Sequence, residues 1–542
     1  MHFFITESSG SDKLIRAQKL MQIAMKRLEV EFYRILSTNR NSLDAESVSS
    51  RTSRASTRAS LSDSEDDTSD EELNSVAESD RVSEIVMKDL KVIADCMIST
   101  GYGKECVKIY KLIRKSIVDE SLYNLGVDRS TSSQINKMEW DVIDYKIKNW
   151  LHNVKVAVKT LFYGERILCD HVFSASDKIR ESCFADISRE GALSLFAFPE
   201  NVAKGKKSPE KMFRILDLYD TISELWPEME FIFSFESTST VRAQAVAALV
   251  KLGEAVRLML ADFEAAIQKD SSKSVVTAGG VHPLARYVMN YVVFLCDYSG
   301  ILSDIVTDWP LTIQSPLPET YTSSPIPGGI EPSAISERLA WIILVLLCKL
   351  DGKANIYKDV SQSYLFLANN LNYVVSKVKT SNLKLLLGDD WLAKHEMKVR
   401  QYAANYERMS WNKVFSSLPD NPAAVLPETA RDCFQRFNAA FEEAYRKQMT
   451  WVISDSKLRD EIKVSVAKKI VPVYRNLYES YRGTFRSEIG VDSVVRYAPE
   501  DLANYLSDLF YGNGVSGSNN NTVSYSYSSS APSSSPSPSR ER

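Results

Sequence analysis

The stretch from Lys457 to Arg486, KLRDEIKVSVAKKIVPVYRNLYESYRGTFR, shows most clearly the helical pattern on which this chain is built. On a helical wheel with about 100° per residue, seven apolar residues of this stretch fall within an arc of about 140°. Such a stripe is typical of an amphipathic helix with one face on a core. Pro472 predicts a kink, and Gly483 predicts the end of the helix. The apolar set is Leu458, Ile462, Val466, Ile470, Val473, Leu477 and Tyr481.

Five cations share the opposite face of this predicted helix and extend over roughly 40 Å at 1.5 Å per residue. The stretch holds eight bases and three acids (Asp460, Glu461 and Glu479), a local net of +5 in a chain of net −4. One interpretation is an ordinary solvated face. The other is contact with lipid headgroups, to which each Lys or Arg contributes about 1 kcal/mol. The stripe lacks aromatic residues, which disfavours single-stranded nucleic acid. The five cations are Lys457, Lys468, Arg475, Arg482 and Arg486.

Helical periodicity recurs along most of the chain. Only 20 Gly and 18 Pro occur in 542 residues, which disfavours β-hairpins, and an apolar fraction of 44% allows a large core. Residues 14–36 form an amphipathic helix that either packs on its own chain or joins a coiled coil. The predicted fold class is all-α, a non-repetitive stack of antiparallel helix pairs. The other predicted helices span 82–99, 102–120, 133–162, 208–225, 238–268, 281–306, 333–350, 353–379, 389–416, 427–449, 456–482 and 499–510.

Three segments depart from this pattern. Residues 39–81 are rich in Ser and Arg and then in acids, which predicts a disordered linker after an N-terminal helix in 1–38. Residues 310–332 contain six prolines and predict a surface loop. Residues 511–542 predict a disordered, low-complexity tail. The helical body then spans 82–510, with a C-terminal bundle from about 420. Candidate phosphorylation sites in the linker, beside basic or acidic residues, are Ser53, Ser56, Ser60, Ser62 and Ser64.

Signatures of chemistry are scarce. Seven widely spaced cysteines without a CxxC pair predict reduced thiols in a cytosolic protein. His395-Glu396 begins like HExxH, but Val399 replaces the second histidine. A GxGxxG string at 512–517 has no strand before it, so it predicts no phosphate site. The longest uncharged apolar run, 339–348, is too short to span a bilayer. We therefore expect no enzyme, no metal and no cofactor.

Five strings stand out for their specificity: LMQIAMKRLEVEFYRIL at 20–36, GERILCD at 164–170, SPEKMF at 208–213, HPLARYVMNY at 282–291 and YAPEDL at 497–502. Together they resemble the plant 70-kDa exocyst subunit family. The resemblance covers residues 14 to 510, and within the family the chain is most similar to the H class.

The resemblance implies an elongated rod of stacked helical bundles without enzymatic activity. It implies an exocyst subunit that tethers secretory vesicles to the plasma membrane, cytoplasmic and peripherally attached there. The implied partners are other exocyst subunits, Rho-type GTPases and phosphatidylinositol 4,5-bisphosphate, and not nucleic acid. The lipid would bind basic residues of the C-terminal bundle, for which the candidates are Lys457, Lys468, Lys469, Arg475, Arg482, Arg486 and Arg496.

The chain departs from the family pattern in three places. Animal members carry two lysines three apart before the last helix, and the matching positions here are Ser493 and Arg496. Family members usually have a longer N-terminal coiled-coil region, and the tail after Phe510 extends beyond the usual end. The alternative function is a helical protein-interaction scaffold in trafficking or immunity that does not touch lipid. A third class, a hydrolase with a dispersed site, would need a polar pocket.

Overall fold

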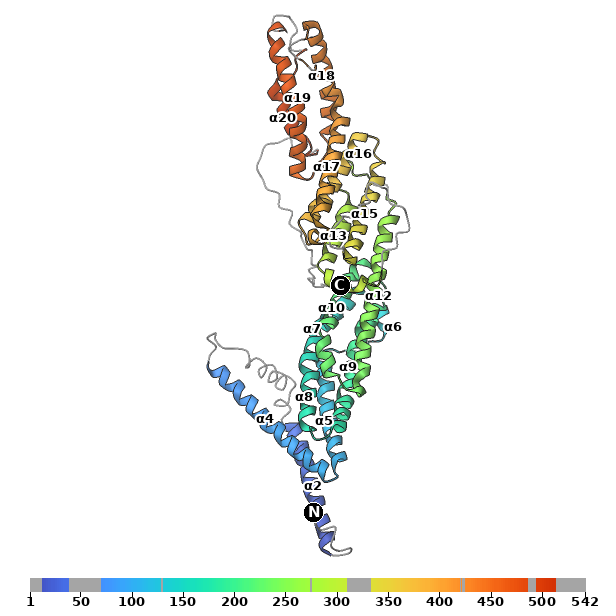
Figure 1. Cartoon of the computed structure of the whole chain (residues 1–542), viewed down its shortest axis with the longest axis vertical. Coiled ribbons are helices and arrows are strands. Elements are labelled where there is room, and N and C mark those ends of the chain that lie inside the picture. Colours follow the sequence, from blue (N-terminus) through green and yellow to red (C-terminus); the bar gives the residue numbers. More distant parts are fainter. Residues whose placement is uncertain are drawn as a thin grey trace, which may run out of the picture. The chain divides into compact units, whose positions relative to one another are not determined.

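The chain folds into α-helices, as its periodicity predicts (Figure 1). The computed structural model describes residues 12–38, 70–127, 130–272, 275–309, 333–419, 421, 425–485 and 494–512. Within these ranges there is no β-strand, only an isolated antiparallel bridge between Val452 and Tyr511. The all-α fold class is therefore confirmed. None of the described helices is both long enough and apolar enough to cross a bilayer.

The helices are grouped into two compact units. Unit 1 comprises Met1–Asp270 and Phe294–Ile342, and unit 2 comprises Ser271–Val293 and Ile343–Arg542. Helices α13 (Pro283–Cys296) and α15 (Ala334–Ala354) contribute to both. The helices of unit 2 are α16 (Val360–Lys379), α17 (Leu383–Phe415), α18 (Pro427–Gln448), α19 (Ser456–Phe485) and α20 (Pro499–Ser507). Those of unit 1 are α2 (Asp12–Thr38), α4 (Asp70–Ser99), α5 (Gly103–Asn124), α6 (Ser132–Lys137), α7 (Trp140–Val156), α8 (Tyr163–Val172), α9 (Asp177–Ala203), α10 (Met212–Glu224), α11 (Trp226–Ile232), α12 (Ser239–Lys269) and α14 (Ser299–Val306), with a π-helical turn at Ala157–Phe162 and 3₁₀ turns at Pro209–Lys211 and Glu236–Thr238.

Helix α9 is the centre of unit 1 and packs against both α5 and α12 (Figure 1). Gly191 in the middle of α9 allows the close approach of α5, because a Cβ there would lie 2.3 Å from Leu122 Cδ1. The sequence pattern predicted no helix between 162 and 208, and that prediction was wrong. The first half of α9 has an exposed polar stripe that includes Ser182, Asp186 and Glu190, but no residue from Gly191 to Ala203 is exposed, so the stripe stops midway along the helix. Gly191 and Pro199 lie inside it and also look like helix breakers.

A buried ion pair joins α5 to α8 in the same unit. Arg114 donates to Glu165, with an Nη2 to Oε2 distance of 2.7 Å, and both side chains are almost fully excluded from solvent. Burial is the largest effect on the pKa of Arg114 and lowers it, but the Glu165 carboxylate together with Tyr110 and Cys169 raises the pKa above its ordinary value. The Tyr110 hydroxyl donates to the other Glu165 oxygen at 3.2 Å. The GERILCD string, which carried part of the family resemblance, thus supplies a core carboxylate.

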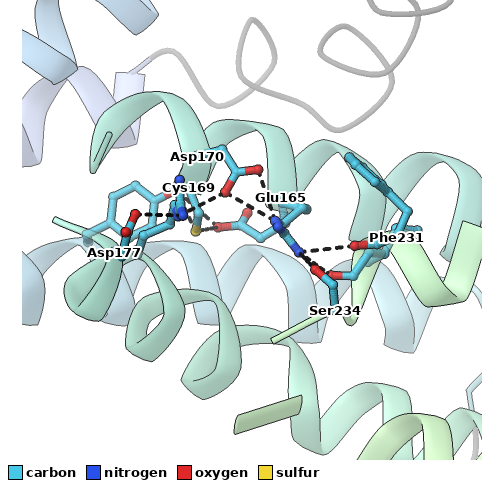
Figure 2. A network of polar contacts seen from close by, with 10 residues as sticks. Glu165, Cys169, Asp170, Asp177, Phe231 and Ser234 are labelled. Atoms are coloured by element: carbon cyan, nitrogen blue, oxygen red, sulfur yellow. Dashed lines mark hydrogen bonds and ion pairs between the residues drawn. The ribbon is translucent and has the colours of Figure 1, made fainter. Parts of the chain in front are cut away.

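The next residue of that string, Arg166, fixes the end of α11. Its guanidinium donates to Asp170, to the carbonyl of Ile232 at 2.8 Å and to the hydroxyl of Ser234 at 2.9 Å. It also lies 3.8 Å above the Phe235 ring. Figure 2 shows Asp170 on α8 facing Phe231 and Ser234 across this network. Arg166 therefore satisfies carbonyls that α11 leaves unpaired at its C-terminus.

Two predicted boundaries need correction. Helix α4 starts at Asp70, so residues 70–81 are helical and do not belong to the predicted linker. Only Leu73, Val76 and Ala77 are apolar between 70 and 81, so the sequence has no apolar stripe that would predict this part of the helix. The predicted helix 281–306 is two helices, because α13 ends at Cys296 and α14 begins at Ser299. Residues 39–69 and 310–332, the tail after 512 and the candidate phosphorylation serines lie outside the described residues.

Candidate membrane-contact site

Helix α19 buries the face that its sequence predicts. Six of the seven predicted apolar residues are buried, and Val473 is half-buried. Tyr474 is buried beside it, and its hydroxyl donates to the carbonyl of Tyr497 at 2.7 Å. The helix continues through Pro472 and past Gly483 to Phe485, so the predicted end at Gly483 was wrong. The buried face fixes which way the remaining side chains of α19 point.

An aromatic cluster holds α19 against α18 and α20. The Tyr474 ring lies 4.5 Å from the Phe437 ring and 5.7 Å from the Phe434 ring, both on α18. Phe441 in turn contacts Tyr497, at 5.4 Å between ring centroids. Such pairs contribute about 0.5–1.5 kcal/mol each beyond the burial of their area. None of these contacts involves a cation of the predicted stripe, so the fold of the bundle does not depend on that stripe.

Three of the predicted lipid-binding residues are exposed on the outer face of α19. Lys457 and Lys468 have no carboxylate partner among the described residues. Arg475 is half-exposed and lies 3.7 Å from Glu500, a loose ion pair. From Lys457 to Arg475 the stripe spans roughly 27 Å at 1.5 Å per residue. Lys457 and Lys468 are available to an external anion, and Arg475 would have to exchange its loose contact with Glu500 for one.

Two other predicted residues are already engaged. Lys469 pairs with Glu407 of α17, a buried carboxylate that also accepts a hydrogen bond from Ser465 at 2.8 Å. Arg496 pairs with Glu442 of α18 at 2.8 Å. Both cations thus connect neighbouring segments of the bundle. The side chains of Arg482 and Arg486 lie outside the described residues.

The charge balance of α19 is less basic than its sequence suggests. Two further bases pack inward. Arg459 and Lys463 lie over the Tyr511 ring, at 4.5 Å and 4.3 Å, and Lys463 also donates to the carbonyl of Ser507. Sequence reasoning did not find this contact, because Tyr511 is distant in the chain. The exposed acids of the helix, Asp460, Glu461 and Glu479, equal Lys457, Lys468 and Arg475 in number. Attraction to an anionic surface must therefore come from how these charges are placed.

Two family models match this chain, one over most of its length and one over its first residues. The model for the C-terminal part of Exo70, described as an exocyst complex subunit, matches residues 148–508. The model for the N-terminal part, described as Exocyst complex component Exo70 N-terminal, matches residues 1–38.

Individual proteins are also similar to this chain, over most of its length. Exocyst complex component EXO70B1 of Arabidopsis thaliana is 33% identical over 528 residues, which covers 92% of this chain and 80% of the relative. EXO70A1 of the same plant is 32% identical over 445 residues, covering 80% and 67%. The crystal structure of the S. cerevisiae exocyst component Exo70p matches with a TM-score of 0.56 at 15% identity, covering 93% of this chain and 92% of that one. This last likeness shows a shared fold.

Proposed function

Because this chain belongs to the Exo70 family, we propose that it is a subunit of an exocyst complex and helps to tether secretory vesicles to the plasma membrane. The curated relatives are named as exocyst complex components, which supports this role and a non-enzymatic one. Other exocyst subunits are then its partners. A Rho-type GTPase belongs to the same proposal on family resemblance alone.

We further propose that the outer face of α19 contacts phosphoinositide headgroups, with the protein peripherally attached to the membrane. The observation that carries this is the row Lys457, Lys468 and Arg475, which points away from the buried face. Each such cation contributes about 1 kcal/mol near an anionic leaflet, and the attraction falls off within a Debye length of about 8–10 Å. Binding should therefore be weak per site, additive and sensitive to salt.

Sedimentation with liposomes that contain phosphatidylinositol 4,5-bisphosphate tests the lipid part of the proposal. The triple variant Lys457→Glu, Lys468→Glu, Arg475→Glu should lose most binding at low salt. Each reversal removes an attraction and adds a repulsion, about 2 kcal/mol per site. Circular dichroism of this variant should match that of the parent chain, since none of the three side chains is buried.

The matched control reverses three exposed cations of α17 in the same unit, Lys384, Lys394 and Arg400, with the same change in net charge. It should bind liposomes like the parent chain. Equal losses in both triple variants would mean that only total charge matters and would refute a site on α19. A pair of reversals at Arg482 and Arg486 reports separately on the end of the stripe.

Affinity purification from cells tests the tethering part. Recovery of other exocyst subunits supports it. A chain that is abundant and folded but recovers none would favour the alternative, a helical scaffold outside the exocyst.

A further inference from the structure

A lysine-rimmed cavity in unit 1 has no part in the function described so far. It has a volume of about 230 Å³ and lies under the turn that leads into α10, next to the SPEKMF string. Lys206, Lys207 and Lys211 come from this turn and the 3₁₀ turn that follows it. The cavity is smaller than those that enclose drug-sized ligands. Its volume suits the short aliphatic chain of a ligand whose polar head group stays at the rim.

The walls of the cavity are apolar and come from five helices. They include Trp140 at the start of α7, whose ring lies 4.9 Å from the ammonium group of Lys211. Six other wall residues are almost fully excluded from solvent. An aliphatic group that enters the cavity would therefore be surrounded by apolar side chains. The apolar wall residues are Ile135, Ile143, Val202, Ile215, Ala255 and Met259.

The rim of the cavity is cationic, with Glu210 as a neighbouring acid that does not line it. No Asp or Glu lines it, and none of Lys206, Lys207 and Lys211 has a carboxylate partner among the described residues. By contrast, Lys204, which does not line the cavity, pairs with Glu200 at 2.5 Å. Lys211 donates to the carbonyl of Lys206 at 2.9 Å and lies 4.9 Å above the Trp140 ring, so its ammonium group is held at the mouth.

The pKa of Lys211 fits a position at which an anion would be favoured. Burial, followed by the neighbouring Lys206 charge, lowers the pKa of Lys211. An anion placed between these ammonium groups would reverse the repulsion and supply charge-assisted hydrogen bonds, which are among the strong ones in proteins.

We infer that this cavity binds a small anionic amphiphile, with its aliphatic chain against the apolar walls and a phosphate head between Lys206, Lys207 and Lys211. An apolar body and a charged head satisfy both parts of the site at once. Inorganic phosphate would leave the walls uncovered, and an alcohol of the same chain length would leave the lysines unpaired.

Calorimetric titration of the full chain with octyl phosphate tests the inference. We expect one saturable site, and at least about tenfold weaker binding of octanol and of inorganic phosphate. The variant Lys206→Ala, Lys207→Ala, Lys211→Ala should bind octyl phosphate at least about tenfold more weakly. The control is Lys137→Ala, Lys204→Ala, Lys251→Ala, which removes the same charge from lysines of unit 1 that do not line the cavity. It should bind like the parent chain.

Two further variants locate the ligand. Octyl phosphate should change the tryptophan emission of the parent chain but not that of Trp140→Phe. Ala255→Leu fills the cavity from α12 and should weaken octyl phosphate without changing the affinity for inorganic phosphate. Absence of a saturable site, equal binding of octanol, or equal losses in the two lysine triples would each overturn the inference. Loss of lipid binding by α19 would leave it untouched, since the two sites lie in different units.

Discussion

The guanidinium of Arg114 and the carboxylate of Glu165 meet at 2.7 Å in the core of unit 1, and neither side chain is more than 1% exposed. The pair ties α5 to α8 at a depth where water cannot replace either partner. Removing one member of such a pair is costly because the other is left as an uncompensated buried charge.

Glu165→Gln should therefore lower the free energy of unfolding of unit 1 by about 3–5 kcal/mol. Denaturant unfolding followed by circular dichroism measures the loss. The control is Glu190→Gln, which breaks the Lys115–Glu190 pair between α5 and α9, where the side chains are 39% and 56% exposed. Exposed pairs contribute about 0–1 kcal/mol, so equal losses in the two variants would contradict the role given to the buried pair.

The thiols should differ sharply in reactivity. Cys96 is exposed, whereas Cys106, Cys169 and Cys183 are fully buried. Burial raises the pKa of both Cys106 and Cys183 to about 12, so they stay protonated near neutral pH. Ellman's reagent at pH 8 should modify Cys96 rapidly, and Cys96→Ser should remove that fast phase. Rapid labelling of Cys106 or Cys183 in the native chain would show that unit 1 opens readily.

The same two thiols predict a loss of stability in alkali. The unfolded chain releases these protons above an ordinary pKa of 9.0, whereas the folded chain retains them up to about 12. Their contribution is fully present below pH 9 and is lost as the pH rises from 9 towards 12. The loss approaches about 1.4 kcal/mol per pH unit for each thiol. Unfolding of the parent chain and of Cys106→Ala, Cys183→Ala at pH 8 and pH 10 measures it, and the double variant should show the shallower dependence.

Leu477→Glu should unfold the C-terminal bundle of unit 2. The side chain is fully buried, and a carboxylate placed there has no partner to offset its desolvation. Asn476→Glu is the control, because the preceding residue of α19 is exposed. Proteolysis after each substitution should cut the Leu477 variant within 427–507 and spare the control. Resistance of the Leu477 variant would mean that α19 can rotate on the bundle.

The periodicity of apolar residues predicted the helices that have one solvent-exposed face, and it missed a helix where that face is incomplete. The buried stripe of α19 followed directly from the spacing of Leu458, Ile462 and their successors, and the predicted start at 389 falls just after Gly388, where the backbone of α17 turns with φ of 81°. Helix α9 was missed because its exposed polar face ends at Glu190, and no residue of its second half is exposed. A pattern of apolar and polar residues predicts a helix only where one face is exposed to solvent.

The candidate site could be predicted only in part for a similar reason. A helical wheel separates the two faces of one helix but contains no information about its neighbours. Lys469 differs from Lys468 because Glu407 of α17 reaches it, and Arg459 differs from Lys457 because Tyr511 covers it. Those partners are 52 to 62 positions away, so only the packed structure separates structural cations from free ones.

The contact between Gly191 and Leu122 has a consequence for how this chain can diverge. Because a methyl group on residue 191 would collide with the Leu122 side chain, the two positions share one volume across the α5–α9 interface. Alanine at 191 would require the Leu122 side chain to shift, whereas a shorter side chain at 122 would leave room for it. The residues tolerated at the two positions therefore depend on each other.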